Sequence, residues 1–424
     1  MRSRHVVVVV LDGLRPDMAV PNLTPNLNAL RRNGVWHTSA RSVYPSVTRV
    51  ISASLATGSL PIEHGLHGNR MALAAGNSYK VYNTGHPEFI SLWRGMRGQA
   101  LRRVTLAQLI APLGEVRVFS NVSPGASYLQ DPDGHGFVCN RGGSFAPGRI
   151  PTTEGMGLKL GITGDAELTH LCIGHLEKAL PPRLTVLWLS EPDDTGDHYP
   201  LGSPEHLAAL AAADACLGQI ADAIRRREDC DWLLIACSDH GQETEIDTVD
   251  VALELVRAGL KADPDSTEIV VAPNGSAGLV YCAPGQGAGA AEVANFLRRS
   301  SWCGEIFPFP PSKGAEEGSL DRPDLFFSMA KHPGCNAYGI PGLTFATHDP
   351  EAPKGRLNRG THGGCGIHEL ASMLLACGPG FPLGAVQAKH VSLLDVAPTV
   401  LTHLGLYDEA RSMRGTALQQ EGLS

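Results

Sequence analysis

The stretch His5–Asp12, with the sequence HVVVVVLD, decides the fold. Its five consecutive valines and one leucine form an apolar run with no polar alternation, which is typical of a strand buried on both faces of a parallel sheet. Asp12 and a glycine follow this run directly. Because ligands bind beyond the carboxyl ends of the strands in such sheets, Asp12 lies where a functional site is expected.

Two further apolar runs also end in acidic residues. Leu184–Leu189 leads into Ser190-Glu191-Pro192-Asp193, and Trp232–Cys237 leads into Ser238-Asp239-His240. Helical patterns lie between and beyond the strands, at 21–34, 47–56, 204–226 and 393–406. Strands that alternate with helices predict an α/β fold with a doubly wound, mostly parallel sheet. Three aspartates would then share one rim of that sheet.

The chain divides into a catalytic core and an insertion. We expect residues 1–262 and 356–424 to form the core, and residues 263–355 to form an inserted cap. The insertion contains Pro, Gly and Ser clusters, a hairpin pattern at 268–283 and a short helical pattern at 291–299. The stretch 69–155 is Gly-rich and is expected to be irregular, with loops that contact substrate.

Composition limits the classes of partner. The 424 residues carry a formal net charge of −8 and are 43% hydrophobic, so there is no basic surface for a nucleic-acid polymer or an anionic membrane. A small-molecule phosphate or phosphonate ester would need metals or arginines close to it. The ten cysteines form no CxxC pair and are expected to be reduced thiols. With no leader pattern or apolar run of membrane length, the sequence predicts a cytoplasmic protein.

The three rim aspartates predict a metal site, since they would repel one another without a cation. Nitrogen ligands lie nearby in the sequence. His240 adjoins Asp239, His198 is close to Asp193, and His362 lies in Gly360–Gly364, where small residues would leave room for a ligand. Aspartate and histidine together suit zinc, manganese or iron.

The order of these motifs resembles the alkaline phosphatase superfamily, in particular its nucleotide pyrophosphatase/phosphodiesterase branch and the related phosphonoacetate hydrolases. The resemblance covers residues 6–72, 186–242 and 359–403. Its motifs are Leu11-Asp12-Gly13, the pair Thr57-Gly58, His64-Gly65-Leu66-His67-Gly68-Asn69, Ser238-Asp239-His240-Gly241 and Gly360-Thr361-His362-Gly363. In that family the nucleophile precedes the Thr of the Thr-Gly pair by nine positions, which is Thr48 here.

The resemblance implies a binuclear site and a phospho-threonine intermediate. One ion would be held by Asp12, Asp239 and His240 and would activate Thr48. The other would be held by Asp193, a residue near position 197 and His362. The resemblance also assigns Asn69 to a phosphoryl oxygen. Thr48 opens a helix, whose N-terminus favours anions, and coordination to a dication lowers the pKa of a hydroxyl. The expected cofactors are two divalent metal ions, with zinc preferred over manganese or iron.

One motif departs from the family pattern. Relatives carry Asp-x-x-x-His, whereas an ungapped alignment here pairs Asp193 with Asp197, followed by His198. The Glu-Pro-Asp start and the Gly-Ser-Pro-Glu stretch at 202–205 support this register, so we expect Asp197 to be the ligand rather than His198. A carboxylate in place of a neutral imidazole adds one negative charge to the site. That charge lowers the Lewis acidity of the ion and favours harder ions such as manganese.

The function that the sequence favours is metal-dependent hydrolysis of phosphodiesters or nucleotide-type phosphate esters. A phosphonoacetate-type carbon–phosphorus hydrolase is the alternative, and it requires basic side chains for a carboxylate. A non-catalytic metal- or ligand-binding relative is an alternative of another class. A sulfatase is disfavoured because 45–49 (PSVTR) lacks the Cys-x-Pro-x-Arg motif. Arg49 is either a phosphate clamp or a solvent-facing helix residue. Basic candidates for the carboxylate are Arg70, Lys80, Arg102 and Arg103.

Overall fold

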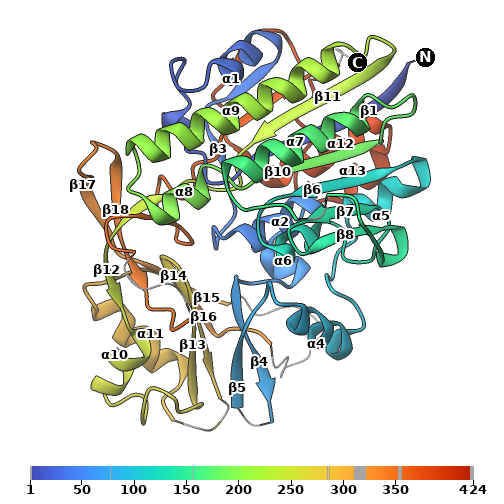
Figure 1. The fold of residues 1–424 in the computed structure, drawn as a ribbon. Helices are drawn as coiled ribbons and strands as arrows, with labels where there is room; N and C mark the ends of the chain where they lie inside the picture. Colours follow the sequence, from blue (N-terminus) through green and yellow to red (C-terminus); the bar gives the residue numbers. More distant parts are fainter. Residues whose placement is uncertain are drawn as a thin grey trace.

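The computed structural model describes residues 2–76, 78–155, 157–283, 285, 287–309, 321–351 and 356–420. Its centre is a ten-stranded sheet with the order β21-β2-β20-β11-β1-β10-β6-β7-β8-β9 (Figure 1). The strands in chain order are β1 Ser3–Leu11, β2 Val35–His37, β6 Val116–Ser120, β7 Phe137–Asn140, β8 Gly143–Ala146, β9 Ile150–Thr152, β10 Leu184–Leu189, β11 Cys230–Cys237, β20 Leu374–Cys377 and β21 Ala385–Gln387. Strand β1 pairs in parallel with both β10 and β11, which confirms the predicted α/β fold with a mostly parallel central sheet.

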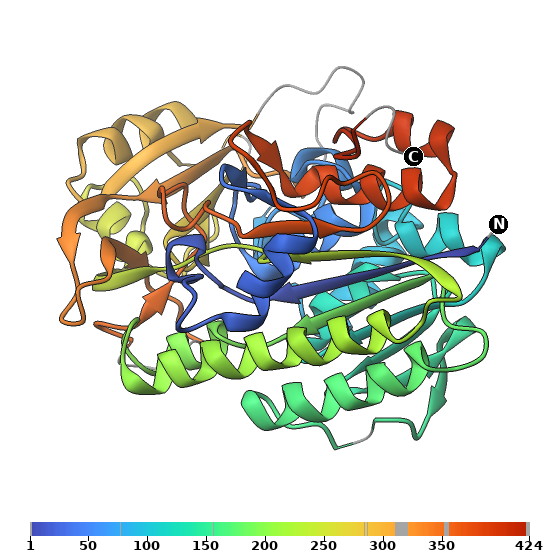
Figure 2. The ribbon, with the colours of Figure 1, turned by 90° about the horizontal axis from the view of Figure 1, so that it is seen from above.

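The valine run of β1 serves two hydrophobic cores, one on each face of the sheet. Val6, Val8 and Val10 face the core built with helices α2 Thr48–Thr57, α5 Leu106–Ile110 and α12 Val396–Leu404. Val7 and Val9 face the core built with α1 Pro25–Leu30, α7 Ile162–Leu176 and α9 Pro204–Arg225. Figure 2 shows the long helices α7 and α9 lying along one face of the sheet. Burial on both faces explains why the strand has no polar residue from Val6 to Leu11.

Two sequence predictions in the core need correction. The predicted helix at 21–34 is shorter, because α1 covers Pro25–Leu30 and a 3₁₀ turn covers Arg31–Asn33. The stretch 69–155 is not irregular. It contains the hairpin β4 Arg70–Ala75 and β5 Ser78–Asn83, helices α4 Pro87–Arg97 and α6 Pro124–Gln130, and four strands of the central sheet. Its elements are short, so they carry little periodic signal. Most of its strands pair with a neighbouring strand of the same stretch, and β6 joins them to the central sheet through β10.

The inserted region adds two smaller sheets. One has the order β13-β14-β16-β15, and it contains the predicted hairpin as β13 Ile269–Asn274 and β14 Ala277–Cys282. The predicted short helix is α11 Ala290–Arg299. The other has the order β17-β18-β12-β19, where β12 Glu243–Val249 precedes position 263. Parts of the predicted cap, at 310–320 and 352–355, lie outside the described residues. The other strands of these two sheets are β15 Cys303–Pro308, β16 Leu325–Met329, β17 Lys331–Cys335, β18 Pro341–Thr347 and β19 Gly360–Thr361. Helix α10 Val251–Arg257 packs against the first sheet, and both α10 and β19 lie outside the predicted 263–355.

Helix α9 has the length and apolar composition of a membrane span, whereas no such segment was predicted from the sequence. Half of its most apolar window is buried inside the protein. Leu210, Leu217 and Ile220 pack there against the central sheet, as in the core helix of a globular domain. All ten cysteines are free thiols, in agreement with the prediction.

We expect Ile235→Ala to lower the free energy of unfolding by about 2–5 kcal/mol, because it leaves a cavity in a packed core. Ile235 is fully buried on β11, between β1 and β20. Denaturant unfolding followed by circular dichroism measures the change. Leu180→Ala is the control, since Leu180 is 87% exposed, and its effect should stay within about 0.5 kcal/mol. Equal effects at the two positions would contradict this assignment of the core.

Candidate metal and phosphate site

The three predicted aspartates meet at one rim of the central sheet. Strands β10, β1 and β11 are neighbours in that order, and Asp193, Asp12 and Asp239 follow their carboxyl ends. Two hydrogen bonds link the three loops, one between main-chain atoms and one from a main-chain N–H to a carboxylate. Asp193 N donates to Asp12 O at 3.1 Å, and Gly13 N donates to Asp239 Oδ1 at 3.1 Å. The rim is therefore a rigid part of the sheet.

Four side chains converge on a first ligand position. His240 Nε2 lies 3.4 Å from Asp12 Oδ1, 3.2 Å from Asp239 Oδ2 and 3.3 Å from Thr48 Oγ1. Around a tetrahedral zinc with bonds of about 2.0–2.1 Å, neighbouring ligand atoms are about 3.3–3.4 Å apart. The spacing of these side chains therefore fits a single ion.

The hydrogen bonding of the two buried carboxylates also fits a cation. Asp12 Oδ2 accepts a hydrogen bond from Trp188 Nε1 at 3.0 Å, while within the described chain Asp12 Oδ1 is buried with no such partner. Asp239 Oδ1 accepts hydrogen bonds from the main-chain N–H groups of Gly13 and His240. Asp239 Oδ2 has no hydrogen-bond partner among the described residues. A buried oxygen without a partner is costly, and an ion would satisfy both.

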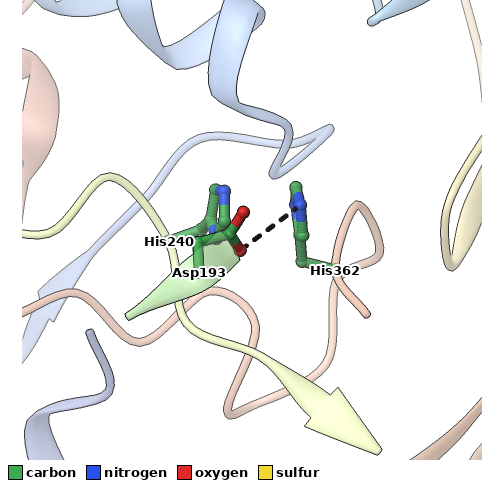
Figure 3. Close-up of side chains that lie close together, drawn as sticks. All are labelled: Asp193, His240 and His362. Atoms are coloured by element: carbon green, nitrogen blue, oxygen red, sulfur yellow. Dashed lines mark ion pairs between the residues drawn. The ribbon is translucent and has the colours of Figure 1, made fainter. Parts of the chain in front are cut away.

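A second group, of Asp193, His240 and His362, shares the histidine of the first (Figure 3). His362 Nε2 lies 3.8 Å from Asp193 Oδ1, and the rings of His240 and His362 stack with centroids 3.7 Å apart. His362 Nδ1 lies 2.8 Å from Ser46 O, an arrangement in which Nδ1 donates and Nε2 keeps its lone pair for a ligand. Gln242 Nε2 donates to the same Asp193 oxygen that faces His362.

Asp197 and His198 occupy different environments. Asp197 lies on α8 Asp193–His198 and lines the same cavity as Asp193, and its Oδ2 is 2.7 Å from Arg356 Nη2. It stands apart from the close group of Asp193, His240 and His362. The His198 side chain is 59% exposed, and its Nδ1 lies 2.7 Å from Asp194 O. Ligation by Asp197 rather than His198 stays a prediction.

Burial and mutual repulsion perturb the whole group. Burial raises the pKa of the Asp12 carboxyl well above its ordinary value, and the charges of Asp239 and Asp193 raise it further. Burial also raises the pKa of Asp193 to about 7 and that of Asp239 to about 6. Burial and the neighbouring His362 lower the pKa of His240, which is therefore a neutral imidazole. This is the state in which histidine binds metal.

Thr48 and Asn69 border the same cavity. Helix α2 begins at Thr48, with Val47 rather than Thr48 as its N-cap residue. Asn69 Oδ1 accepts a hydrogen bond from Arg49 N at 3.1 Å, and Asn69 O accepts one from Arg49 Nη1 at 2.9 Å. Since the amide oxygen of Asn69 is held in this way, its NH₂ group remains as a donor toward a ligand.

The structure decides the orientation of Arg49, which the sequence left open. Arg49 lines the cavity and donates from Nε to Ser123 Oγ at 3.0 Å, so its side chain does not point to solvent. Of the basic candidates for a carboxylate, Arg70 lines the cavity, and Lys80, Arg102 and Arg103 do not. Two basic residues that sequence reasoning missed, Arg141 and Arg356, also line it.

Two glycines at the His362 loop, Gly363 and Gly275, make room for main chain rather than for a ligand. A Cβ on Gly363 would lie 2.0 Å from Asn274 O, at a backbone φ of 122°. A Cβ on Gly275 would lie 2.0 Å from His362 O. The turn between β13 and β14 thus rests directly on the His362 loop. Asn274 also joins this turn to β4, since its side chain accepts from Arg70 N and donates to Arg70 O.

Supporting residues on other elements were also missed by sequence reasoning. Asp165 on α7 accepts hydrogen bonds from Ser190 N and Glu191 N, at 2.9 and 3.0 Å, and so holds the loop that precedes Asp193. Lys331 and Glu369 form an ion pair of 2.6 Å beneath the His362 loop. These contacts join residues that are far apart in the chain, and no local motif marks them.

The raised pKa of Asp193 predicts a pH-dependent stability of the metal-free protein. Ionised Asp193 destabilises the fold, a contribution that is absent below about 3.8 and grows as the pH rises to about 7. We therefore expect Asp193→Asn to stabilise the chelator-stripped protein more at pH 8 than at pH 5, by on the order of 1 kcal/mol. With metal bound, the same substitution should destabilise, because a ligand is lost.

Thermal unfolding at both pH values, with and without metal, measures this effect. Asp222→Asn is the matched control, because the Asp222 side chain is 57% exposed and far from the rim in the fold. It should change the stability by less than about 0.5 kcal/mol at either pH. If Asp193→Asn destabilises the metal-free protein at pH 8, the repulsion described above is not the dominant effect.

Comparison with known proteins gives matching sequences and folds. A family model described as type I phosphodiesterase/nucleotide pyrophosphatase matches residues 6–295. Venom phosphodiesterase 2 of Crotalus adamanteus is 26% identical over 248 residues, which are 56% of this chain and 27% of the relative. Human ectonucleotide pyrophosphatase/phosphodiesterase family member 1 is 26% identical over 242 residues, which are 55% of this chain and 23% of that protein. The match thus spans about a quarter of the length of these relatives.

Solved structures share the fold over nearly the whole chain. Murine ectonucleotide pyrophosphatase/phosphodiesterase 5 matches with a TM-score of 0.67 and 18% identity, covering 95% of both chains. Phosphonoacetate hydrolase from Sinorhizobium meliloti, in complex with phosphonoformate, matches with a TM-score of 0.66 and 17% identity, covering 95% of this chain and 96% of the other. At these sequence identities, the similarity to the two solved structures shows the fold alone. With the family model covering most of the chain, the protein belongs to the type I phosphodiesterase/nucleotide pyrophosphatase family.

Proposed function

We propose that this protein is a hydrolase of phosphate or phosphonate esters that uses Thr48 as its nucleophile and two divalent metal ions. The observation that carries the proposal is the convergence of Thr48 Oγ1, Asp12 Oδ1 and Asp239 Oδ2 on His240 Nε2, at 3.2–3.4 Å. Membership of the family and the folds of the two solved relatives support hydrolysis of phosphorus esters.

Each part of the site has a role in this proposal. Asp12, Asp239 and His240 would hold one ion, and Asp193, Asp197 and His362 the other. When bound, divalent ions lower the pKa of a hydroxyl or a water and neutralise charge on phosphoryl oxygens. Zinc is the preferred ion, and manganese or iron would also suit these ligands.

The residues of the chain itself supply positioning. Thr48 presents its hydroxyl at the N-terminus of α2, where the helix dipole favours a phosphoryl group. Its oxygen would form a bond to phosphorus as the bond to the ester oxygen breaks, and the hydroxyl proton would end on the departing alcohol. Water would then hydrolyse phospho-Thr48, which releases phosphate and restores the Thr48 hydroxyl. The NH₂ group of Asn69 donates to an equatorial oxygen, while Arg49 holds that side chain in place.

A carbon–phosphorus hydrolase is the second candidate, and the lining of the cavity favours it. The cavity holds about 340 Å³, and its lining includes Arg49, Arg70, Arg141 and Arg356. Among the described residues that line it there is no Phe, Tyr or Trp to stack on a nucleobase. Arg70 and Arg356 are paired with carboxylates, whereas Arg49 and Arg141 form no ion pair among the described residues. A small phosphonate with a second anionic group would find guanidinium partners in Arg49 and Arg141.

A substrate panel tests the function and separates the candidates. The panel contains nitrophenyl phosphate, bis-nitrophenyl phosphate, a nucleotide diester and phosphonoacetate, each with metal-free protein and with added zinc, manganese or iron. Turnover of the diesters supports the first candidate, and phosphate release from phosphonoacetate supports the second. Binding of metal without any turnover would support the alternative that the protein is a non-catalytic, metal-binding relative. Full activity of chelator-stripped protein would contradict the metal dependence.

Thr48→Ala is expected to reduce kcat by several orders of magnitude, because no other hydroxyl stands at that position. The fold should remain, with a loss of stability of about 1 kcal/mol. Mass spectrometry of protein quenched during turnover should find phosphate on Thr48. Thr48→Ser is the matched control and should keep measurable turnover. A Thr48→Ala protein with a near-native rate would show that water or another residue is the nucleophile.

Asn69→Ala is expected to lower kcat by roughly 10²–10³-fold, the usual cost of removing one donor to a developing oxyanion. Metal content should not change, since Asn69 is not a proposed ligand. Steady-state kinetics and metal analysis together provide the measurement. Asn83→Ala is the control, because Asn83 also lines the cavity but has no proposed role. If the two variants lose activity equally, Asn69 has no special role.

A further inference from the structure

We propose that Asp197 and Arg356 act as a unit that takes the place of the family's histidine at the second metal position. Asp197 offers its Oδ1 to the ion, and Arg356 holds its Oδ2 and offsets its charge. This inference rests on the proposed function, because it concerns the second of the two ions. It makes Arg356 a positioning residue, since it acts through Asp197.

The hydrogen bonding of Asp197 repeats a pattern seen at the first position. Its Oδ2 is 2.7 Å from Arg356 Nη2, while within the described chain its Oδ1 is buried with no hydrogen-bond partner. Asp12 and Asp239 divide their oxygens in the same way, with one bound by the protein and one buried without a partner. All three carboxylates therefore present a single oxygen, as metal-ligating carboxylates do when a neighbouring donor orients them.

Arg356 offsets the extra negative charge that Asp197 brings to the second metal position. Exchanging a neutral imidazole for Asp197 adds one negative charge to the second position. The guanidinium of Arg356 restores the net charge of a set with one aspartate and two neutral histidines. The pair is partly buried, with side chains 21% and 31% exposed, so solvent does not fully screen it. The lower Lewis acidity expected from the sequence is thereby offset.

The position of Arg356 in the chain links the pair to the other ligands of the second ion. Arg356 precedes β19, and β19 leads directly into His362. Strand β19 pairs with β12, and β12 begins just after His240. Helix α8 carries Asp193 and Asp197 together and contacts β19. The helix and the strand therefore bring the carboxylate and its guanidinium to one side of the cavity.

A double-mutant cycle on the full chain tests the inference. Chelator-stripped wild type, Asp197→His, Arg356→Gln and the double variant are titrated by calorimetry with Zn²⁺ alone and with Mn²⁺ alone. Asp197→His should weaken binding of the second ion by roughly 10- to 100-fold, because Arg356 then faces the ion without its carboxylate. The double variant should bind the second ion within about threefold of the wild type. Binding of the first ion should stay the same in all four proteins.

The coupling between the two positions is the decisive readout. With Asp197 present, Arg356→Gln frees the Oδ2 atom that the guanidinium holds and should weaken binding of the second ion. In the Asp197→His background the same substitution removes an uncompensated positive charge and should strengthen binding, so its two effects have opposite signs. Additive effects, or a second ion that binds equally well to Asp197→His alone, would overturn the proposal. Asp197→Asn gives the same comparison if histidine does not fit, and circular dichroism checks the fold of each variant.

A control and two outcomes separate this inference from the proposed function. Arg141→Gln removes another guanidinium from the lining of the cavity. Among the described residues, Arg141 forms no ion pair with a carboxylate, so the substitution breaks none. It should leave both ion affinities unchanged. A wild type that binds two ions and hydrolyses esters, but shows no coupling, refutes only the pairing of Asp197 with Arg356. A wild type that binds no metal refutes the binuclear hydrolase as well.

Discussion

The structure depends on the mutual repulsion of buried carboxylates at one rim of the central sheet. Asp12, Asp193 and Asp239 follow three neighbouring strands. Burial raises the pKa of each, and the charges of neighbouring aspartates raise those of Asp12 and Asp193 further. Hydrogen bonds among the strand-end loops prevent the three groups from moving apart. A cation at this rim relieves the repulsion and satisfies the free oxygens of Asp12 and Asp239. The rest of the site is arranged around that requirement.

The second constraint is the contact between the core and the inserted region. The β13–β14 turn rests on the His362 loop at Gly275 and Gly363, where main chain meets main chain. The Ser46 carbonyl orients His362, and Ser46 lies two residues before the start of helix α2. His362 is thus held between the loop that precedes α2 and the β13–β14 turn.

Charge balance at the proposed second metal position would depend on a residue far from Asp197 in the chain. An aspartate at position 197 alone would make the second position more anionic than a site with two histidines. Arg356 lies 2.7 Å from Asp197 and balances that charge. Nearby, Arg70 is paired with Asp349 and Glu351, whereas Arg49 contacts a hydroxyl and a carbonyl. The cavity is therefore rich in arginine, although the formal net charge of the chain is −8.

The sequence by itself determined the elements whose signal is local. The valine run of β1, the strand ends at Asp12, Asp193 and Asp239, and the helix that starts at Thr48 could all be read from patterning and spacing. The irregular appearance of 69–155, the side-chain direction of Arg49, and the roles of Asp165 and Lys331 could not. Arg356 lies 159 positions from Asp197 in the chain, and only tertiary folding brings the two together. Local patterns record which face of an element is buried, whereas side-chain pairing between distant segments depends on how the chain closes in space.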